Sequence, residues 1–273
     1  YITRKVADKL KSLFNENRED FEKKWNDIKV VIEYGILTDE KFYEKSSAFT
    51  LFPTVDDTYL TLDEIKDQLK TNQTDKDGKL VVLYASNKET QHSFISAAKD
   101  KNYQVLLLDS PIVSHLIQKL EMDNENLTFV RVDSDHVDNL IKKDENLISK
   151  LSDAEITILK EAVEKTVEGS AYTVQTEAMD SNAAPFMITQ PEFMRRMKEM
   201  QASGGAGMFG NFPEMYNLVV NTNSDLANKI LTTTDDLVKS TMIKQALDLA
   251  KISQGLLKGE ELTAFVKRNF ENM

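Results

Sequence analysis

The three histidines and the carboxylates around them are the side chains in this sequence that could most readily act in catalysis or bind a metal. His92, His115 and His136 fall in separate segments, and none has the paired spacing of a zinc site such as HExxH. The densest polar group runs from Asp133 to Asp138 in the order DSDHVD. An enzyme acting through this group is one hypothesis. A cap for the helix expected at residues 137–141 is the simpler interpretation, because polar side chains ahead of a helix accept bonds from its free N–H groups.

A second acidic stretch, QTDKDGK at residues 73–79, resembles a calcium loop because Asp75 and Asp77 precede Gly78. The further oxygen ligands and the closing glutamate are missing, so we expect a polar turn instead. The sequence has no cysteine, which excludes disulfides, thiol catalysis and thiolate metal sites and is typical of a reducing compartment. These residues therefore predict no catalytic group, no metal and no cofactor of their own.

The most unusual feature of the sequence is a segment rich in methionine and other large apolar residues. Six of the ten methionines lie between Met187 and Met215. Phe193, Met197 and Met200 repeat at helical spacing, with basic residues between them, which predicts a short amphipathic helix. The glycine-rich residues 204–212, GGAGMFGNF, follow, and they combine mobility with apolar side chains. Flexible thioethers on such a segment favour a surface for varied partners, and filling of the domain's own core is the alternative.

Composition limits the classes of protein that the chain can belong to. Its 273 residues, 41% hydrophobic and 29% charged, are typical of two folded domains. The formal charge of −11 disfavours a nucleic-acid partner, since it repels phosphate backbones. No apolar run has the length of a membrane span, and we expect no membrane partner. The chain opens at Tyr1 without an initiator methionine, which we interpret as a piece of a longer protein.

Residues 1–72 are expected to be helical. One apolar stripe contains Val6, Leu10, Leu13 and Phe14, and a second contains Phe21, Trp25, Ile28 and Ile32. We expect Trp25 in the core. Gly35 is a typical C-cap for the second helix, Thr38 a cap for a short third one, and Thr61 with Glu64 a capping box for residues 62–69.

Strand and helix patterns alternate between residues 79 and 141. The predicted strands are residues 80–85, 105–108 and 127–132, and the predicted helices are residues 89–101, 111–120 and 137–141. This order favours a small three-stranded parallel αβα layer. The loops after the first two strands, Ser86-Asn87 and Asp109-Ser110, contain no glycine fingerprint, so a nucleotide site is poorly supported.

A charged connector at residues 142–150 leads to a second predicted domain, residues 150–273. Ser152 and Glu155 form a capping box for a helix with its apolar face at Ile156, Leu159, Val163 and Val167. Strands at residues 172–176, 185–189 and 217–221 and a helix at residues 225–231 predict an α+β layer. The overall fold class is therefore α/β and α+β.

Two helices close the chain, at residues 237–257 and after Gly259. Their apolar residues cover more surface than one domain face can bury, which favours a four-helix bundle with a second copy of the chain. Packing back onto the same chain is the alternative. The residues expected in this dimer interface are Val238, Met242, Leu249, Ile252, Leu256, Leu262, Phe265, Val266 and Phe270.

Four segments, in this order, resemble the ninety-kilodalton heat-shock chaperones, above all the bacterial members of that family. They are YITRKVADKLKSLF, KTNQTDKDGKLVVLYAS, ITQPEFMRRMKEM and LDLAKISQGLL. The resemblance covers essentially the whole chain. It implies that residues 1–141 are the distal part of the family's middle domain and residues 150–273 its C-terminal dimerisation domain.

The resemblance also implies a function. The family binds unfolded client proteins through the methionine-bearing helix and loop, here Phe193, Met194, Met197, Met200, Met208, Phe209 and Phe212. ATP and magnesium bind the full-length protein in a domain that does not match these residues, so we expect no enzyme activity from this part alone. A tryptophan of a second client patch corresponds to His115. We therefore expect part of a dimeric, cytoplasmic chaperone. The alternative is a small-ligand-binding or regulatory α/β module with a dimerisation tail.

Overall fold

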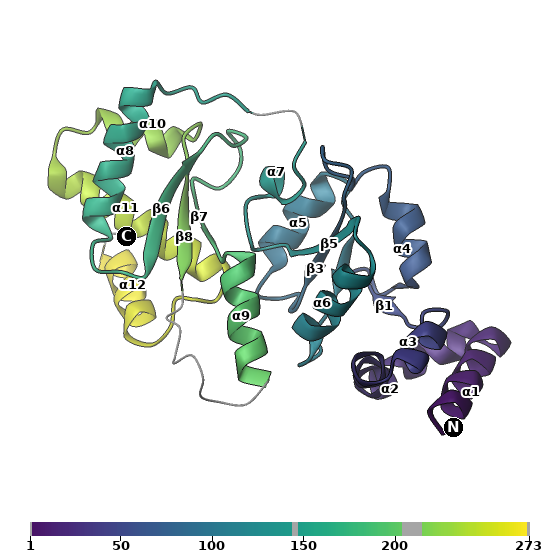
Figure 1. Ribbon diagram of the computed structural model, residues 1–273. Helices are drawn as coiled ribbons and strands as arrows, with labels where there is room; N and C mark the ends of the chain where they lie inside the picture. Colours follow the sequence, from purple (N-terminus) through teal and green to yellow (C-terminus); the bar gives the residue numbers. More distant parts are fainter. Residues whose placement is uncertain (1, 144–146, 204–214, 272–273) are drawn as a thin grey trace.

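The computed structural model describes residues 2–143, 147–203 and 215–271. Within these ranges the fold class is confirmed: two small three-stranded sheets, each with helices around it, lie between an N-terminal group of helices and a C-terminal pair (Figure 1). None of the described helices has the length and apolar character needed to cross a membrane.

The N-terminal helices are α1 (Ile2–Glu16), α2 (Arg18–Thr38) and α3 (Glu40–Ser46). Trp25 is buried between them, as predicted. The expected stripe on α1 is partly wrong: Leu10 and Phe14 pack against the core, but Val6 and Leu13 are exposed, and the fully buried residue is Ala7. A small side chain at that position lets the backbone of α1 come close to its neighbours, and Phe14 then reaches the ring of Phe21 at 5.6 Å.

The predicted boundary at Gly35 is also wrong. Helix α2 continues through Gly35 to Thr38, and Asp39 ends it and caps α3 by accepting a bond from the Phe42 backbone N–H. Thr38 is therefore not the cap. A Cβ at position 35 would lie 2.8 Å from the ring of Phe42, so the glycine serves close helix packing and not termination.

A short hairpin, β1 (Phe52–Pro53) and β2 (Tyr59–Leu60), leads into α4 (Leu62–Leu69). The capping box of Thr61 and Glu64 is confirmed, with both reciprocal bonds present. The expected turn at residues 73–79 is confirmed as well. The Asp75 carboxylate accepts bonds from the backbone N–H groups of Asp77 and Lys79, and Gly78 has a φ of 82°.

The αβα layer follows as predicted, with small shifts at element ends. Its elements are β3 (Leu80–Ala85), α5 (His92–Asp100), β4 (Val105–Leu107), α6 (Val113–Asp123), β5 (Leu127–Arg131) and α7 (Val137–Leu140). The strands are parallel in the order β4-β3-β5. Alternate residues of the central strand serve different cores: Val82 and Tyr84 pack with α6 and the N-terminal helices, and Val81 and Leu83 pack with α5.

The second sheet has the order β6-β8-β7. It contains β6 (Tyr172–Glu177), β7 (Phe186–Thr189) and β8 (Tyr216–Asn221), and α8 (Asp153–Thr166) and α10 (Asp225–Thr232) pack with it. Helix α9 (Glu192–Ser203) follows β7 in the chain. Strand β8 is parallel to β6 and antiparallel to β7. The capping box of Ser152 and Glu155 is confirmed, and Leu159 and Val163 on its helix are fully buried.

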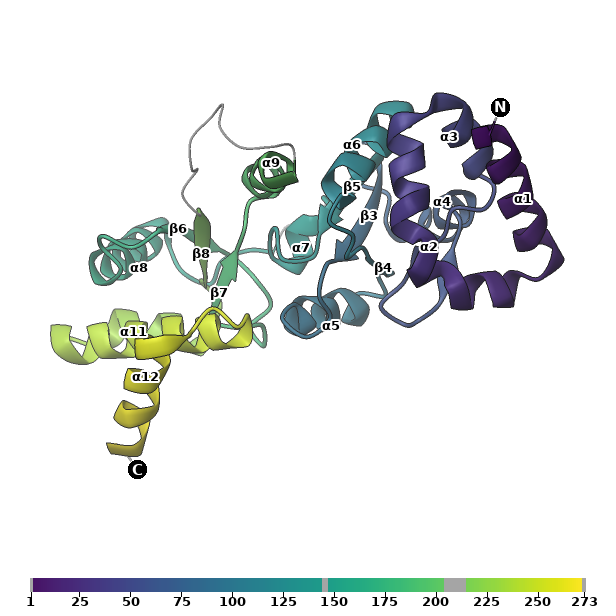
Figure 2. The ribbon, with the colours of Figure 1, turned by 90° about the horizontal axis from the view of Figure 1, so that it is seen from below.

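Helix α11 (Asp236–Ser253) packs under the second sheet, and α12 (Gly259–Glu271) projects away from it (Figure 2). The predicted end of α11 at residue 257 is wrong, because Gly255 adopts a φ of 64° and ends the helix near Ser253. One face of α11 is buried through Ile243 and Ala250. No described residue of α12 is buried.

Candidate functional site

Helix α9 carries the methionine stripe, and in this structure the stripe faces outward. The Phe193 side chain is 70% exposed and Met197 is 39% exposed, while Met194 and Met200 are half-buried. Met208, Phe209 and Phe212, which belong to the same expected surface, lie outside the described residues. Phe193 and Met197 lie four residues apart on the helix, so their exposed apolar surfaces adjoin.

The inward face of α9 is charged. Arg195 is only 3% exposed, and Glu192, Arg196 and Glu199 are partly buried beside it. The helix is therefore amphipathic in the reverse of the usual sense, with ionised groups inside and apolar groups outside. Buried charges are tolerated only where other groups pair with them and fill their hydrogen-bonding positions.

The partners of these charges come from the αβα layer. Arg195 Nη2 donates to the Tyr84 hydroxyl at 2.5 Å, and that hydroxyl donates to Glu192 Oε1 at 3.1 Å. Arg196 Nη1 donates to Glu121 Oε2 of α6 at 2.7 Å, and its Nη2 donates to the carbonyl oxygen of Phe129 at 2.5 Å. Figures 1 and 2 both place α9 next to α6, across the gap between the two sheets.

A third arginine joins the group from the end of β5. Arg131 donates to both carboxylate oxygens of Asp133, at 2.6 and 2.9 Å, and its Nη2 donates to Gln190 Oε1 at 3.0 Å. Its backbone N–H donates to Glu192 Oε2 at 3.1 Å. Ser114 of α6 donates to the Glu199 carboxylate. We call these eight residues the α9 anchor: Tyr84, Ser114, Glu121, Arg131, Glu192, Arg195, Arg196 and Glu199.

The pKa values in the anchor follow from burial and pairing. Burial, and then the negative charge of Glu192, raises the pKa of the Tyr84 hydroxyl, so it stays protonated and can donate. Burial alone would raise the pKa of Glu199. The charge of Arg195 and the bond from Ser114 outweigh it, so the pKa of Glu199 lies below its ordinary value. Glu199 is therefore ionised at neutral pH.

Sequence reasoning missed the anchor. The pattern Glu192, Arg195, Arg196, Glu199 is visible, because opposite charges three and four apart form pairs along a helix. That pattern normally indicates a solvated face. Its true partners, Tyr84 and Glu121, lie 75 or more positions away in the sequence, and no local periodicity connects them.

The polar group at residues 133–138 is not a helix cap, which corrects the sequence interpretation. The residue at the cap position of α7 is His136, and no side chain caps the helix. The carboxylates are engaged elsewhere: Asp133 with Arg131, and Asp138 with Lys101 at 2.8 Å. Asp133 pairs with a residue two positions earlier and Asp138 with the end of α5, so neither carboxylate accepts a bond from the first N–H groups of α7.

His136 is buried, and neither ring nitrogen has a hydrogen-bond partner among the described residues. Its Nδ1 lies 3.9 Å from Asp138 and its Nε2 lies 4.0 Å from Glu177. The ring lines a cavity of about 1210 Å³ whose walls carry lysines as well as carboxylates. Among the described residues, no cluster of three or more His, Asp or Glu side chains has the arrangement to hold a metal ion.

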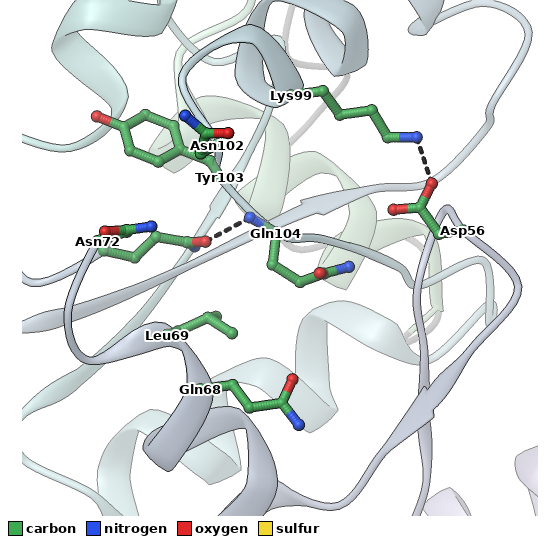
Figure 3. Close-up of a pocket in the computed structure, with 9 residues that line it drawn as sticks. Asp56, Gln68, Leu69, Asn72, Lys99, Asn102, Tyr103 and Gln104 are labelled. Carbon is green, nitrogen blue, oxygen red and sulfur yellow. Dashed lines mark hydrogen bonds and ion pairs between the residues drawn. The ribbon is translucent and has the colours of Figure 1, made fainter.

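A second, smaller pocket of about 420 Å³ lies where α4 meets the αβα layer (Figure 3). Its lining is polar and largely made of amides. The Gln73 side chain donates to the Val81 carbonyl and accepts from the Gln104 backbone N–H at 2.6 Å, and Lys99 pairs with Asp56. These polar groups therefore bond to one another already. His115 is half-buried on α6 and lies outside both pockets.

The two C-terminal helices leave most of the expected interface residues uncovered within one chain. Those with large exposed side chains are Val238, Leu249, Ile252, Leu262, Val266 and Phe270. Met242, Leu256 and Phe265 are half-buried, and Leu256 packs against the core of the second layer. On α12, Phe270 is 72% exposed.

Comparison with known proteins agrees with the resemblance in the sequence. A model of the family described as "Hsp90 protein" matches residues 1–270. The chain is 45% identical to "Chaperone protein HtpG" of Bacteroides thetaiotaomicron, over 85% of this chain and 34% of that protein. It is 41% identical to the protein of that name from Porphyromonas gingivalis, over 92% of this chain and 37% of that protein.

More distant relatives extend the likeness. The chain is 27% identical to "Endoplasmin homolog" of Hordeum vulgare, over 66% of this chain and 21% of that protein. Against the Bacteroides fragilis protein it covers 50% of the length at 35% identity. The chain thus spans half or less of the length of these relatives. Since the family match covers nearly all of its residues, the chain belongs to the Hsp90 family.

Proposed function

We propose that this chain is part of a dimeric molecular chaperone and binds unfolded or partly folded client proteins through the exposed face of α9. The observation that carries this proposal is the outward position of Phe193 and Met197 on a helix whose other face is held by charges. Apolar groups that no core covers, on flexible side chains, suit many apolar sequences in turn. The similarity to the HtpG chaperones supports the same function.

We place residues 1–141 in the distal middle domain of the full-length protein and residues 150–273 in its C-terminal dimerisation domain. Support comes from the separate apolar cores on the two sides of the connector. ATP and magnesium would act in another part of the full-length protein, which would be the ATPase. Residues 1–273 alone are then expected to show no saturable heat of ATP binding by calorimetry. The proposed compartment is the cytoplasm, which suits a chain without cysteine.

The dimer would form through α11 and α12. The exposed apolar residues of these two helices exceed what a solvated surface normally carries in one place. A permanent interface between subunits usually buries about 2,000 Å² or more in total. Two helices from each chain, packed as a four-helix bundle, would supply a surface of that kind.

The test of client binding changes Phe193 and Met197 to serine together. Because both side chains are exposed, we expect the free energy of unfolding to change by less than about 1 kcal/mol. Affinity for reduced, carboxymethylated α-lactalbumin, a permanently unfolded protein, should fall at least tenfold when measured by fluorescence anisotropy. Met122→Ser is the matched control, since it removes an exposed methionine from α6. Unchanged affinity in the double variant, or a collapse of its stability, would refute the assignment of this surface.

A small-ligand-binding or regulatory module is the second candidate. The cavity beside His136 favours it, because a buried ring with two unsatisfied nitrogens lines a space large enough for a metabolite. Its wall carries four lysines and four carboxylates, so it favours neither an anionic nor a cationic ligand. A thermal-shift screen with anionic, cationic and neutral metabolites tests this candidate, and saturable stabilisation by one compound would favour it over the chaperone.

A further inference from the structure

Helix α9 belongs to the second layer by chain connection, yet its polar contacts belong to the first. It follows β7 after only Gln190 and Pro191. Among the described residues, the side-chain hydrogen bonds that Glu192, Arg195 and Arg196 make outside their own helix go to the αβα layer. The short connector is held there too, since the Gln190 backbone N–H donates to the Asp133 carbonyl oxygen at 3.0 Å.

We propose that the α9 anchor positions the client surface, so that the αβα layer and not the second sheet sets the orientation of Phe193 and Met197. Tyr84 and Arg195 are the central positioning residues. This inference rests on the proposed function of the exposed stripe. It adds a constraint on movement of the αβα layer relative to the second sheet. Either α9 moves together with the αβα layer, or the anchor breaks.

The geometry at Tyr84 supports this role. Its side chain is fully buried, and its hydroxyl accepts from Arg195 and donates to Glu192, so one oxygen joins two residues a turn apart on α9. The Arg195 guanidinium also lies over the Tyr84 ring, with its central carbon 5.7 Å from the ring centroid. These contacts fix both the distance of α9 from the sheet and its rotation about its own axis.

Rotation matters because the two faces of α9 are opposite in character. Phe193 and Met197 can face outward only while Arg195 faces the sheet. If the anchor opened, the helix could turn, and apolar groups would then compete with arginines for the inward position. Affinity for an apolar partner would fall, because part of the binding energy would be spent on restoring the orientation.

The anchor is also suited to release. The three arginines of the anchor face its three glutamates, and Asp133, which lies outside it, pairs with Arg131, so the charges nearly balance. Arg195 Nε is buried without a hydrogen-bond partner among the described residues. A network with one unsatisfied donor is less stable than a complete one, so the anchor holds α9 less tightly than its number of ion pairs suggests.

The conservative test is Tyr84→Phe, which removes one hydroxyl and keeps the buried ring. We expect hydrogen exchange in residues 193–201 to become at least fivefold faster, while exchange in β3 and β5 stays the same. Affinity for carboxymethylated α-lactalbumin should fall about five- to tenfold. Tyr172→Phe makes the same chemical change in β6, where the half-buried ring packs against Tyr216, and should alter neither measurement.

A mutant cycle separates positioning from general destabilisation. If Tyr84 acts through the orientation of α9, then Tyr84→Phe should add almost nothing to the loss already caused by changing Phe193 and Met197 to serine. An independent, additive loss would overturn the inference. Unchanged exchange in α9 would overturn it as well, and so would faster exchange with full affinity.

Arg196→Met provides a second variant in case a change at Tyr84 disturbs the sheet. It should loosen α9 in the same way, because Arg196 joins the helix to Glu121 and to the Phe129 carbonyl. Its control is Arg18→Met, which breaks a comparable ion pair with Glu64 between α2 and α4. If the unmodified chain does not bind the unfolded protein, the proposed client function fails, and the exchange measurements still decide whether the anchor holds α9.

Discussion

Helices α9 and α12 both expose apolar side chains, but they are held in different ways. The inward face of α9 carries Arg195, which is only 3% exposed and donates to the fully buried hydroxyl of Tyr84 in the αβα layer. Helix α12 has no buried residue among those described, and its polar links to α11 are Arg268 with Asp248 and Lys251 with Glu261. A narrow apolar stripe on a fixed helix suits a transient partner. A broad apolar surface on a helix with little support suits a permanent one.

The largest effect is expected from a substitution that disrupts the proposed dimer. Leu249→Asp places a charge on the exposed face of α11, within the proposed bundle, where an unpaired charge is strongly unfavourable. We expect the chain to sediment as a dimer at micromolar concentrations and the variant as a monomer. Met122→Asp, a charge at an exposed position on α6, is the control and should remain dimeric. An unmodified chain that sediments as a monomer would remove the proposed difference between α12 and α9.

The second prediction compares Arg195 of α9 with Arg268 of α12. Arg195→Met removes the most buried cation that pairs with Glu192 and Glu199, and we expect the free energy of unfolding to fall by about 3–5 kcal/mol. Arg268→Met removes a more exposed pair, and we expect less than about 1 kcal/mol. Urea denaturation followed by circular dichroism measures both. Equal losses would mean that burial of the anchor is not what distinguishes α9.

The stability that the α9 anchor contributes should also depend on pH, because Glu199 is held in its ionised form. The pKa of Glu199 is lowered in the folded chain, so its ionised form contributes stability above its ordinary value of 4.5, and this contribution is lost as the pH falls toward the folded value. Glu199→Gln should therefore be less stable than the unmodified chain at pH 7, with a difference that shrinks as the pH drops below 4.5. Stability measured by urea titration at several pH values tests this. A difference that stays constant with pH would show that Glu199 is not held by its charge.

The smallest effect concerns salt. The Lys251–Glu261 pair has one exposed member, so added salt should screen it, whereas the buried anchor should respond little. Raising sodium chloride from about 0.05 to about 0.5 M should speed hydrogen exchange in α12 by less than about threefold, and exchange in α9 should not change. Greater salt sensitivity in α9 than in α12 would contradict the comparison.

Local chemistry made much of the fold predictable. The capping boxes at Thr61 and Ser152 lie within four residues, and the strands of both sheets show their burial patterns in consecutive positions. The burial of Trp25 follows from its place in a helical stripe. That Phe193 and Met197 form a client site stays a prediction, and the structure adds to it that both side chains are exposed. Signals of this kind need no knowledge of what lies across the fold.

The inward face of α9 was not predictable in the same way. A helix with arginines and glutamates at pairing distances normally turns them to water, and only the presence of Tyr84 and Glu121 makes their burial possible. The wrong interpretation of residues 133–138 has this cause only in part. Asp138 pairs with Lys101, which comes from the end of another helix. Asp133 instead pairs with Arg131, two positions earlier in the chain, and the sequence alone did not show that it would prefer this arginine to the first N–H groups of α7.

Gly35 has a practical consequence for attempts to make this protein more heat-resistant. Replacing a glycine inside a helix with alanine usually stabilises a protein by about 1 kcal/mol, so position 35, in the last turn of α2, would be an obvious first choice. Here the added methyl carbon would lie 2.8 Å from the ring of Phe42. Helix α3 would have to shift, and Phe42 would lose its packing against Phe49. The substitution that propensity scales recommend most strongly is therefore the one that should lower the melting temperature.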